Sequence, residues 1–168
     1  MNASVFLDTN ILLYAISTAA EEREKKELAR KLVARDDYGL SVQVLQEFYV
    51  NATRPPHPAL THQAATEVIH ELARAPVVAV DLSVMANALD LKARYRLSYW
   101  DAAVIAAAQA LGATTLYSED LSHGQDYDGV RVENPFLAHV REPPPGRYGK
   151  RRRPTPPSSP PTSTPSPR

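Results

Sequence analysis

The sequence predicts an α/β fold, in which a parallel sheet is covered on both faces by helices. Short apolar runs alternate along the chain with longer helical patterns, which is typical of strands joined by helical crossovers. The first run, at residues 4–7, has no polar alternation, which indicates a strand buried on both faces. The chain contains no cysteine, so disulfide frameworks and thiolate zinc sites are excluded.

The first half of the chain reads as strand, helix, helix, strand and helix. These elements are expected at residues 4–7, 10–17, 21–35, 38–42 and 43–53. Leu28 and Leu32 recur at helical spacing in the second helix, which gives this charged segment one apolar face. Pro55 and Pro56 mark the end of the third helix.

The second half reads as helix, strand, two helices and two strands. We expect them at residues 62–74, 77–80, 82–95, 99–111, 114–117 and 130–132. Gly112 suits the C-cap of the helix before it. The longest apolar run, 102–108, predicts a buried helix and is far too short to cross a bilayer. The N-terminus resembles neither a signal peptide nor a membrane span, so we expect a cytoplasmic protein with no membrane contact.

Composition divides the chain into a folded part at 1–140 and a disordered tail at 141–168. Ten of the 15 prolines follow Glu142, and large apolar residues almost disappear there, so the tail cannot bury enough area to offset its ordering entropy. The tail carries a net charge of +6 and the body −6. An acidic body does not favour general binding of nucleic acid, but it can hold a metal. The basic tail is either a dispensable extension or an electrostatic tether for RNA.

Four acidic residues stand where a parallel sheet brings side chains together. Asp8 follows the first strand directly, and Asp120 comes shortly after the strand at 114–117. Ligands of open α/β sheets bind beyond the carboxyl ends of the strands. Glu47 and Asp101 lie in apolar helices, where a carboxylate is costly unless it is paired or bound to a metal.

Each of these acids also has a purely structural explanation. Asp8 can cap the helix that begins near Asn10, and Asp101 can complete a capping box that Ser98 opens. Glu47 can face solvent, and Asp120 can belong to a turn. The joint arrangement of the four is therefore the stronger indication.

Convergence of four carboxylates requires a cation. Two carboxylates about 4 Å apart repel by roughly 4 kcal/mol at an effective dielectric of 20, and each raises the pKa of the other. A site built from oxygen ligands alone favours Mg²⁺ or Mn²⁺ over zinc. Such a metal activates a water and stabilises a leaving oxygen, so the sequence predicts hydrolysis of phosphodiesters without a covalent intermediate.

Four segments resemble the acidic motifs of PIN domains, in order and in spacing. They are Val5-Phe6-Leu7-Asp8-Thr9-Asn10, Gln46-Glu47-Phe48-Tyr49-Val50-Asn51, Tyr99-Trp100-Asp101-Ala102 and Leu116-Tyr117-Ser118-Glu119-Asp120-Leu121. The similarity is strongest to VapC-type toxins, which are small endoribonucleases, and it spans residues 5–136. The tail departs from this family, because most members stop near residue 141.

The resemblance implies a three-layer α/β/α sandwich with a central parallel five-stranded sheet. It also implies RNA as the substrate, Mg²⁺ or Mn²⁺ as the cofactor, a VapB-like antitoxin as a partner and a homodimer. The implied catalytic residues are Asp8, Glu47, Asp101 and Asp120. Asp8 and Asp101 would be the direct metal ligands, and four polar residues would support the site, namely Thr9, Asn10, Asn51 and Ser118.

Two other functions remain open at this point. One is a receiver-like or phosphatase-like Mg²⁺ domain, but the segment Asp8-Thr9-Asn10 lacks the adjacent acidic pair that such a domain needs. The other is a catalytically silent relative that only binds RNA or a partner. We further expect Trp100 to pack in the core, with base stacking as the alternative, and Asp126 and Asp128 to form turns.

Overall fold

The structure, a computed structural model, describes residues 3–137. The predicted tail at 141–168 therefore lies outside the described residues. Six α-helices are described, namely α1 (Thr9–Ile16), α2 (Arg23–Val33), α3 (Val42–Ala52), α4 (His62–Leu72), α5 (Leu82–Tyr95) and α6 (Tyr99–Leu111). A short 3₁₀ turn, η1 (Ala20–Glu22), precedes α2. The strands are β1 (Val5–Leu7), β2 (Tyr38–Ser41), β3 (Val77–Val78), β4 (Thr115–Tyr117), β5 (Asp126–Tyr127) and β6 (Val130–Glu133).

The sheet has the order β3-β2-β1-β4-β6-β5. The five predicted strands are all present, and every pair between them is parallel. The sixth strand, β5, pairs antiparallel with β6 and was not predicted. It forms a hairpin through Asp128 and Gly129, both at positive φ (51° and 98°), as a two-residue type I′ turn requires. The expectation that Asp126 only forms a turn was thus incomplete, because it also begins this strand.

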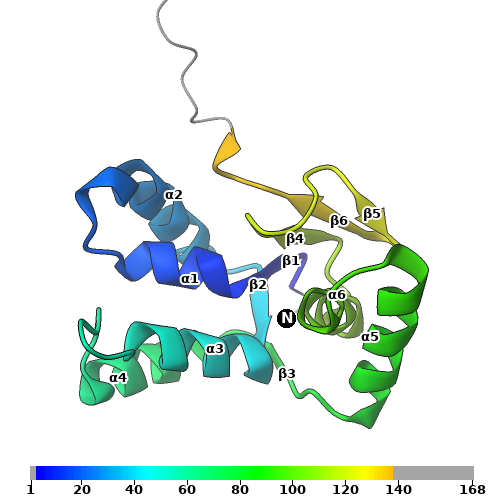
Figure 1. The fold of residues 1–168 in the computed structure, drawn as a ribbon, viewed down its shortest axis with the longest axis horizontal. Coiled ribbons are helices and arrows are strands. Elements are labelled where there is room, and N and C mark those ends of the chain that lie inside the picture. Colours follow the sequence, from blue (N-terminus) through cyan, green and yellow to red (C-terminus); the bar gives the residue numbers. More distant parts are fainter. Residues whose placement is uncertain (1–2, 138–168) are drawn as a thin grey trace, which may run out of the picture.

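Helices cover both faces of the sheet, as predicted for a three-layer sandwich. Figure 1 shows α1 to α4 on one side of the strands and α5 and α6 on the other. The amphipathic α2 packs against α1, and α6 packs against both α5 and the strands. None of the helices in residues 3–137 combines the length and apolar character that crossing a lipid bilayer requires.

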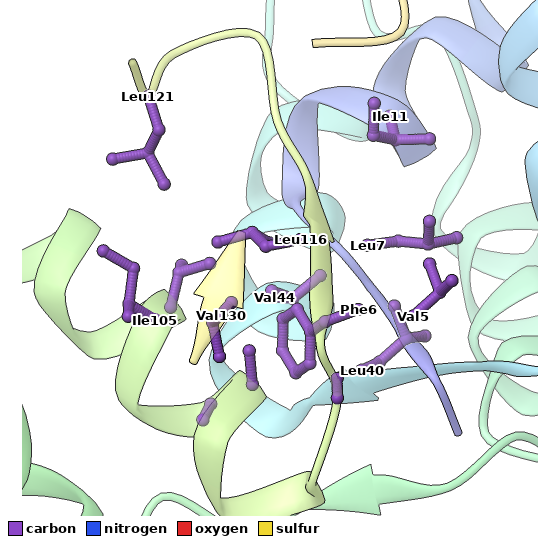
Figure 2. Packing of buried hydrophobic residues seen from close by; sticks show 14 of the residues in the cluster. Val5, Phe6, Leu7, Ile11, Leu40, Val44, Ile105, Leu116, Leu121 and Val130 are labelled. Atoms are coloured by element: carbon purple, nitrogen blue, oxygen red, sulfur yellow. The ribbon is translucent and has the colours of Figure 1, made fainter. Parts of the chain in front are cut away.

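The centre of the molecule is a tightly packed interface between the sheet and α6. Every residue from Ala102 to Ala108 is buried, and the small side chains of this run let the helix lie close to the strands. Figure 2 shows Phe6, Leu116 and Ile105 among the buried side chains of this core. The predicted burial of 102–108 is confirmed, and so is that of residues 5–7 in the first strand, whereas Ser4 is exposed and precedes β1.

Close packing also explains the glycine in β2. A Cβ on Gly39 would collide with the tip of Leu111 at the end of α6, and it would lie 3.0 Å from the carbonyl oxygen of Pro76. Only glycine lets these chain segments approach so closely. The position of α6 over the sheet therefore depends on the absence of a side chain here.

Candidate active site

Asp8 stands at the carboxyl end of β1, in the middle of the sheet. Its backbone N–H donates to the carbonyl of Tyr117 at the end of β4 (3.0 Å), which fixes the two strand ends side by side. Its carboxylate accepts a hydrogen bond from the backbone N–H of Thr9 (2.7 Å) and caps α1. Asp8 therefore does act as the N-cap of α1, which the sequence analysis gave as its structural explanation.

Burial and charge make Asp8 unusual among the acids of this protein. Only 8% of the residue is exposed. Burial raises the pKa of Asp8 from 3.8 to about 6, against the hydrogen bonds from Ser118 and Thr9, and the charges of Asp120 and Glu47 raise it further. A carboxylate in this setting favours a proton or a metal cation as its partner.

Asn10 and Ser118 link Asp8 to Asp120. The buried hydroxyl of Ser118 donates to Asp8 (2.7 Å) and accepts from the backbone N–H of Asp120 (3.2 Å). The amide nitrogen of Asn10 lies 3.3 Å from a carboxylate oxygen of Asp8 and 3.1 Å from one of Asp120. Residues 110 positions apart in the chain are therefore joined in one polar network.

Glu47 reaches the same region from the third helix. It lies on α3, which directly follows β2, and its carboxylate accepts a hydrogen bond from the hydroxyl of Thr9 (3.1 Å). Gln43, one turn earlier on α3, donates to the other oxygen of this carboxylate (2.9 Å). Glu47 is thus held toward Asp8 rather than left free in solvent.

Asp101 occupies a different position in the network. It lies in the first turn of α6, where its backbone N–H donates to Ser98 (3.1 Å) and its carboxylate accepts from the Ser98 hydroxyl (2.7 Å). The first bond is the N-cap half of the capping box that the sequence offered as an alternative, while the carboxylate bonds the Ser98 hydroxyl in place of its backbone N–H. Asp101 is partly exposed, whereas the apolar residues that follow it in α6 are buried, as expected for this helix. Burial in α6 begins at Ala102, and Trp100 and Asp101 in the first turn keep contact with solvent.

The polar contacts therefore bring Asp8, Asp120 and Glu47 together, with Thr9, Asn10 and Ser118 between them, while Asp101 is bonded locally. Within residues 3–137, no three acidic or histidine side chains lie close enough to form a ready-made metal cluster. The donors have the right chemical class for Mg²⁺ or Mn²⁺, because all of them are oxygens. Mg²⁺ is commonly bound through one or two carboxylates, with waters and substrate phosphates filling the remaining positions.

Two further expectations concern residues beside Glu47. The side chain of Asn51 donates to the backbone carbonyl of Glu47 (2.8 Å), so it contacts the helix rather than the carboxylate. Trp100 does not pack in the core, because 63% of it is exposed. Its ring instead meets that of Tyr99 edge to face, with the centroids 5.3 Å apart.

A polar cluster next to Asp120 was not found from the sequence. Glu119 forms an ion pair with Lys25 of α2 and accepts a hydrogen bond from Tyr14 of α1. Burial opposes ionisation of Glu119, but the hydrogen bonds from Lys25 and Tyr14 lower its pKa below the ordinary value. Because Glu119 precedes Asp120, this cluster ties the loop that carries Asp120 to two helices. Gln43 was also missed, although its position four residues before Glu47 is a spacing at which helical side chains interact.

Comparison with known proteins places the fold in a family. A family model described as PIN domain matches residues 5–124, which is most of the chain. No curated protein is a significant match to the sequence.

Known structures share the fold at low sequence identity. A toxin–antitoxin complex from Klebsiella pneumoniae is 20% identical, with a TM-score of 0.57 over 79% of this chain and 98% of that one. The Mycobacterium tuberculosis toxin VapC20, described as cleaving the sarcin–ricin loop, is 22% identical, with a TM-score of 0.55 over 70% and 90%. The DNA-bound VapBC of Salmonella typhimurium is 18% identical, with a TM-score of 0.55 over 77% and 96%.

Proposed function

The chain belongs to the PIN domain family, and from this premise we propose that it is an endoribonuclease that depends on Mg²⁺ or Mn²⁺. One observation carries the proposal. Asp8 is a buried carboxylate at the carboxyl ends of β1 and β4, and the charges of Asp120 and Glu47 help to raise its pKa to about 6. Such a group favours a cation, and a phosphodiester is the substrate that most directly uses one. The family match leaves the receiver-like alternative without support.

In the proposed site, Asp8 and Asp101 hold the ion, and Glu47 and Asp120 assist them. A divalent ion supplies charge stabilisation of the phosphate and activation of the attacking water. The chain's own residues fix the oxygens that take part. Ser118 and the backbone of Thr9 orient the carboxylate of Asp8. The carboxylate therefore needs little reorientation when substrate binds.

Glu47 is the residue we assign to orienting the attacking water. Gln43 and Thr9 each bond one of its two oxygens, which restricts its rotation while leaving it partly exposed. Asn10 donates toward both Asp8 and Asp120, and it thereby offsets part of their repulsion when no cation is present. Asn51 supports the site only indirectly, through the backbone of Glu47.

We further propose that the protein is the toxin of a VapBC-type pair. Two of the structures with the same fold are described as toxin–antitoxin or VapBC assemblies, and a third as a toxin that cleaves the sarcin–ricin loop. On this proposal the chain acts in the cytoplasm, a VapB-like antitoxin binds and silences it, and it forms a homodimer. Residues 1–140 are the nuclease domain, and 141–168 are an appendage.

The direct test is cleavage of a structured RNA by purified protein with Mg²⁺ or Mn²⁺. Wild-type protein should cut the RNA and lose this activity when EDTA is added. Asp8→Asn and Asp101→Asn should each reduce the rate by at least about 100-fold, whereas Lys31→Gln on the exposed side of α2 should not change it. Cleavage by Asp8→Asn at the wild-type rate would refute the proposal.

One observation favours a second candidate, a silent member that binds RNA or a partner without cutting. The described residues contain no group of three acids spaced for a metal. The same experiment separates the two candidates. Binding of RNA by wild-type protein, without cleavage in either metal, would favour the silent member.

A further inference from the structure

Trp100 is the only tryptophan in the chain, and it lies open to solvent beside the candidate active site. Tryptophan side chains are highly buried on average, yet 63% of this residue is exposed. It directly precedes Asp101 at the start of α6. Its ring meets that of Tyr99 edge to face, and most of the remaining aromatic surface faces solvent.

A cavity of about 500 Å³ lies between Trp100 and α3. Its remaining lining comes from α3 and from one residue just beyond the end of this helix, namely Gln43, Gln46, Glu47, Val50, Asn51 and Arg54. The volume is within the range of sites that bind small organic ligands. Because Glu47 is part of the wall, whatever occupies this cavity touches the candidate active site.

The lining combines three kinds of chemistry that a nucleotide needs. Trp100 offers an aromatic face for a base, and the amides of Gln46 and Asn51 can both donate and accept hydrogen bonds. Arg54 offers a cation for a phosphate, and it pairs with no carboxylate among residues 3–137. The net charge of the folded part is negative. An arginine in the wall of this cavity therefore favours an anionic ligand here.

The lining groups are spread along α3 and just beyond it. Glu47 lies in the second turn of α3, and Arg54 follows the helix, which ends at Ala52. The carboxylate of the candidate active site and the cation therefore lie at different places along the wall of the cavity. A strand of nucleic acid can run between them, with one base against Trp100.

We propose that this cavity is a substrate subsite for single-stranded RNA, with one unpaired base stacked on Trp100 and a flanking phosphate bound by Arg54. This inference rests on the proposed function and names the substrate class for the same site. The base must be unpaired, because an aromatic side chain stacks on bases that have left a duplex. Recognition of this kind tolerates any base, since each has a π face.

The single tryptophan makes the test direct. Full-length wild-type protein in EDTA, which prevents cleavage, is titrated with an eight-nucleotide oligoadenylate while its intrinsic fluorescence is recorded. We expect saturable quenching by this strand and at least tenfold weaker binding of a blunt RNA duplex of equal length. A shift of emission that depends only on protein concentration would overturn the proposal, because it would show a second copy of the chain covering Trp100.

Variants are compared by the anisotropy of the labelled oligoadenylate, which needs no tryptophan. Trp100→Ala should weaken binding about 10-fold, as expected for the loss of one stacked base, and Trp100→Phe should stay within about threefold of wild type. Arg54→Gln should weaken binding. It should also reduce the slope of the logarithm of the binding constant against the logarithm of the salt concentration by about one, which corresponds to one phosphate contact fewer. Lys31→Gln makes the same charge change on α2 and should have no effect.

Cleavage kinetics separate this inference from the proposed function. With Mg²⁺ or Mn²⁺, Trp100→Ala should raise KM about 10-fold and leave kcat within about threefold. If wild-type protein cuts RNA but Trp100→Ala has an unchanged KM, the subsite is wrong and the ribonuclease stands. If wild-type protein does not cut RNA but its fluorescence is quenched as described, the proposed function is wrong and the RNA site stands.

Discussion

Replacing Asp8 by Asn should stabilise the metal-free protein at neutral pH. Burial and the charges of Asp120 and Glu47 raise the pKa of Asp8 from 3.8 to about 6. Between these values the folded chain binds a proton that the unfolded chain has released, so stability falls as the pH rises through this window. Above pH 6 the carboxylate is ionised in both states, and its burial then lowers the free energy of unfolding by the full amount.

The size of this penalty follows from the same values. One pKa unit corresponds to about 1.4 kcal/mol, so the ionised Asp8 costs about 3 kcal/mol above pH 6. Asparagine keeps an oxygen that can accept from the N–H of Thr9 (2.7 Å in the wild type), but an amide nitrogen replaces the oxygen that accepts from Ser118 and Asn10. We therefore expect a net gain of about 1–3 kcal/mol, which raises the melting temperature by roughly 3–10 °C.

The assay is urea unfolding in EDTA, followed by circular dichroism from pH 4 to pH 8. The gain of Asp8→Asn should be full at pH 7 and should shrink to a small fraction of that value at pH 4, where the folded wild type is protonated at this position and the unfolded chain is about 40% protonated. Asp36→Asn removes an equal charge from an exposed position and serves as the control. Equal stability of Asp8→Asn and wild type at pH 7, or a gain that persists undiminished at pH 4, would refute the reasoning.

Three further substitutions test other parts of the molecule. Gly39→Ala should lower the free energy of unfolding by about 1–3 kcal/mol, because its methyl group meets Leu111 and a backbone carbonyl; an unchanged urea midpoint would contradict the packing. Glu119→Gln should slow RNA cleavage several-fold with little loss of stability, because it weakens the contacts that hold the loop carrying Asp120. Glu24→Gln, on the exposed side of α2, should match wild type in the same assay. Ser98→Ala should lower the melting temperature by an amount equivalent to about 1 kcal/mol, because α6 loses its N-cap, and equal melting curves would show that the cap contributes nothing.

Much of the site could be predicted because it depends on chain order alone. Asp8 and Asp120 follow strands that lie next to each other in the sheet, and the carboxyl ends of parallel strands meet at one edge. Glu47 follows β2 within two turns of helix, so its approach to the same edge needs no unusual geometry. Whether these residues hold a metal stays a prediction.

Other features depend on contacts between distant segments, which spacing along the chain does not reveal. Lys25 and Glu119 are 94 positions apart, and each alone reads as an ordinary surface charge. Trp100 was expected in the core because α6 is apolar nearly all round, but its first turn projects beyond the sheet that buries the rest. The two residues of β5 are too few for a periodic pattern, although Asp128-Gly129 is the usual sequence of a hairpin turn.

Titration of Mn²⁺ into purified wild-type protein and its variants, followed by calorimetry, tests most directly whether the folded chain gathers its acids around a cation. We expect saturable binding by the wild type, at least tenfold weaker binding by Asp8→Asn and by Asp101→Asn, and smaller losses for Glu47→Gln and Asp120→Asn. Binding to Asp8→Asn as tight as to wild type would contradict the account, because the ion would then be held elsewhere.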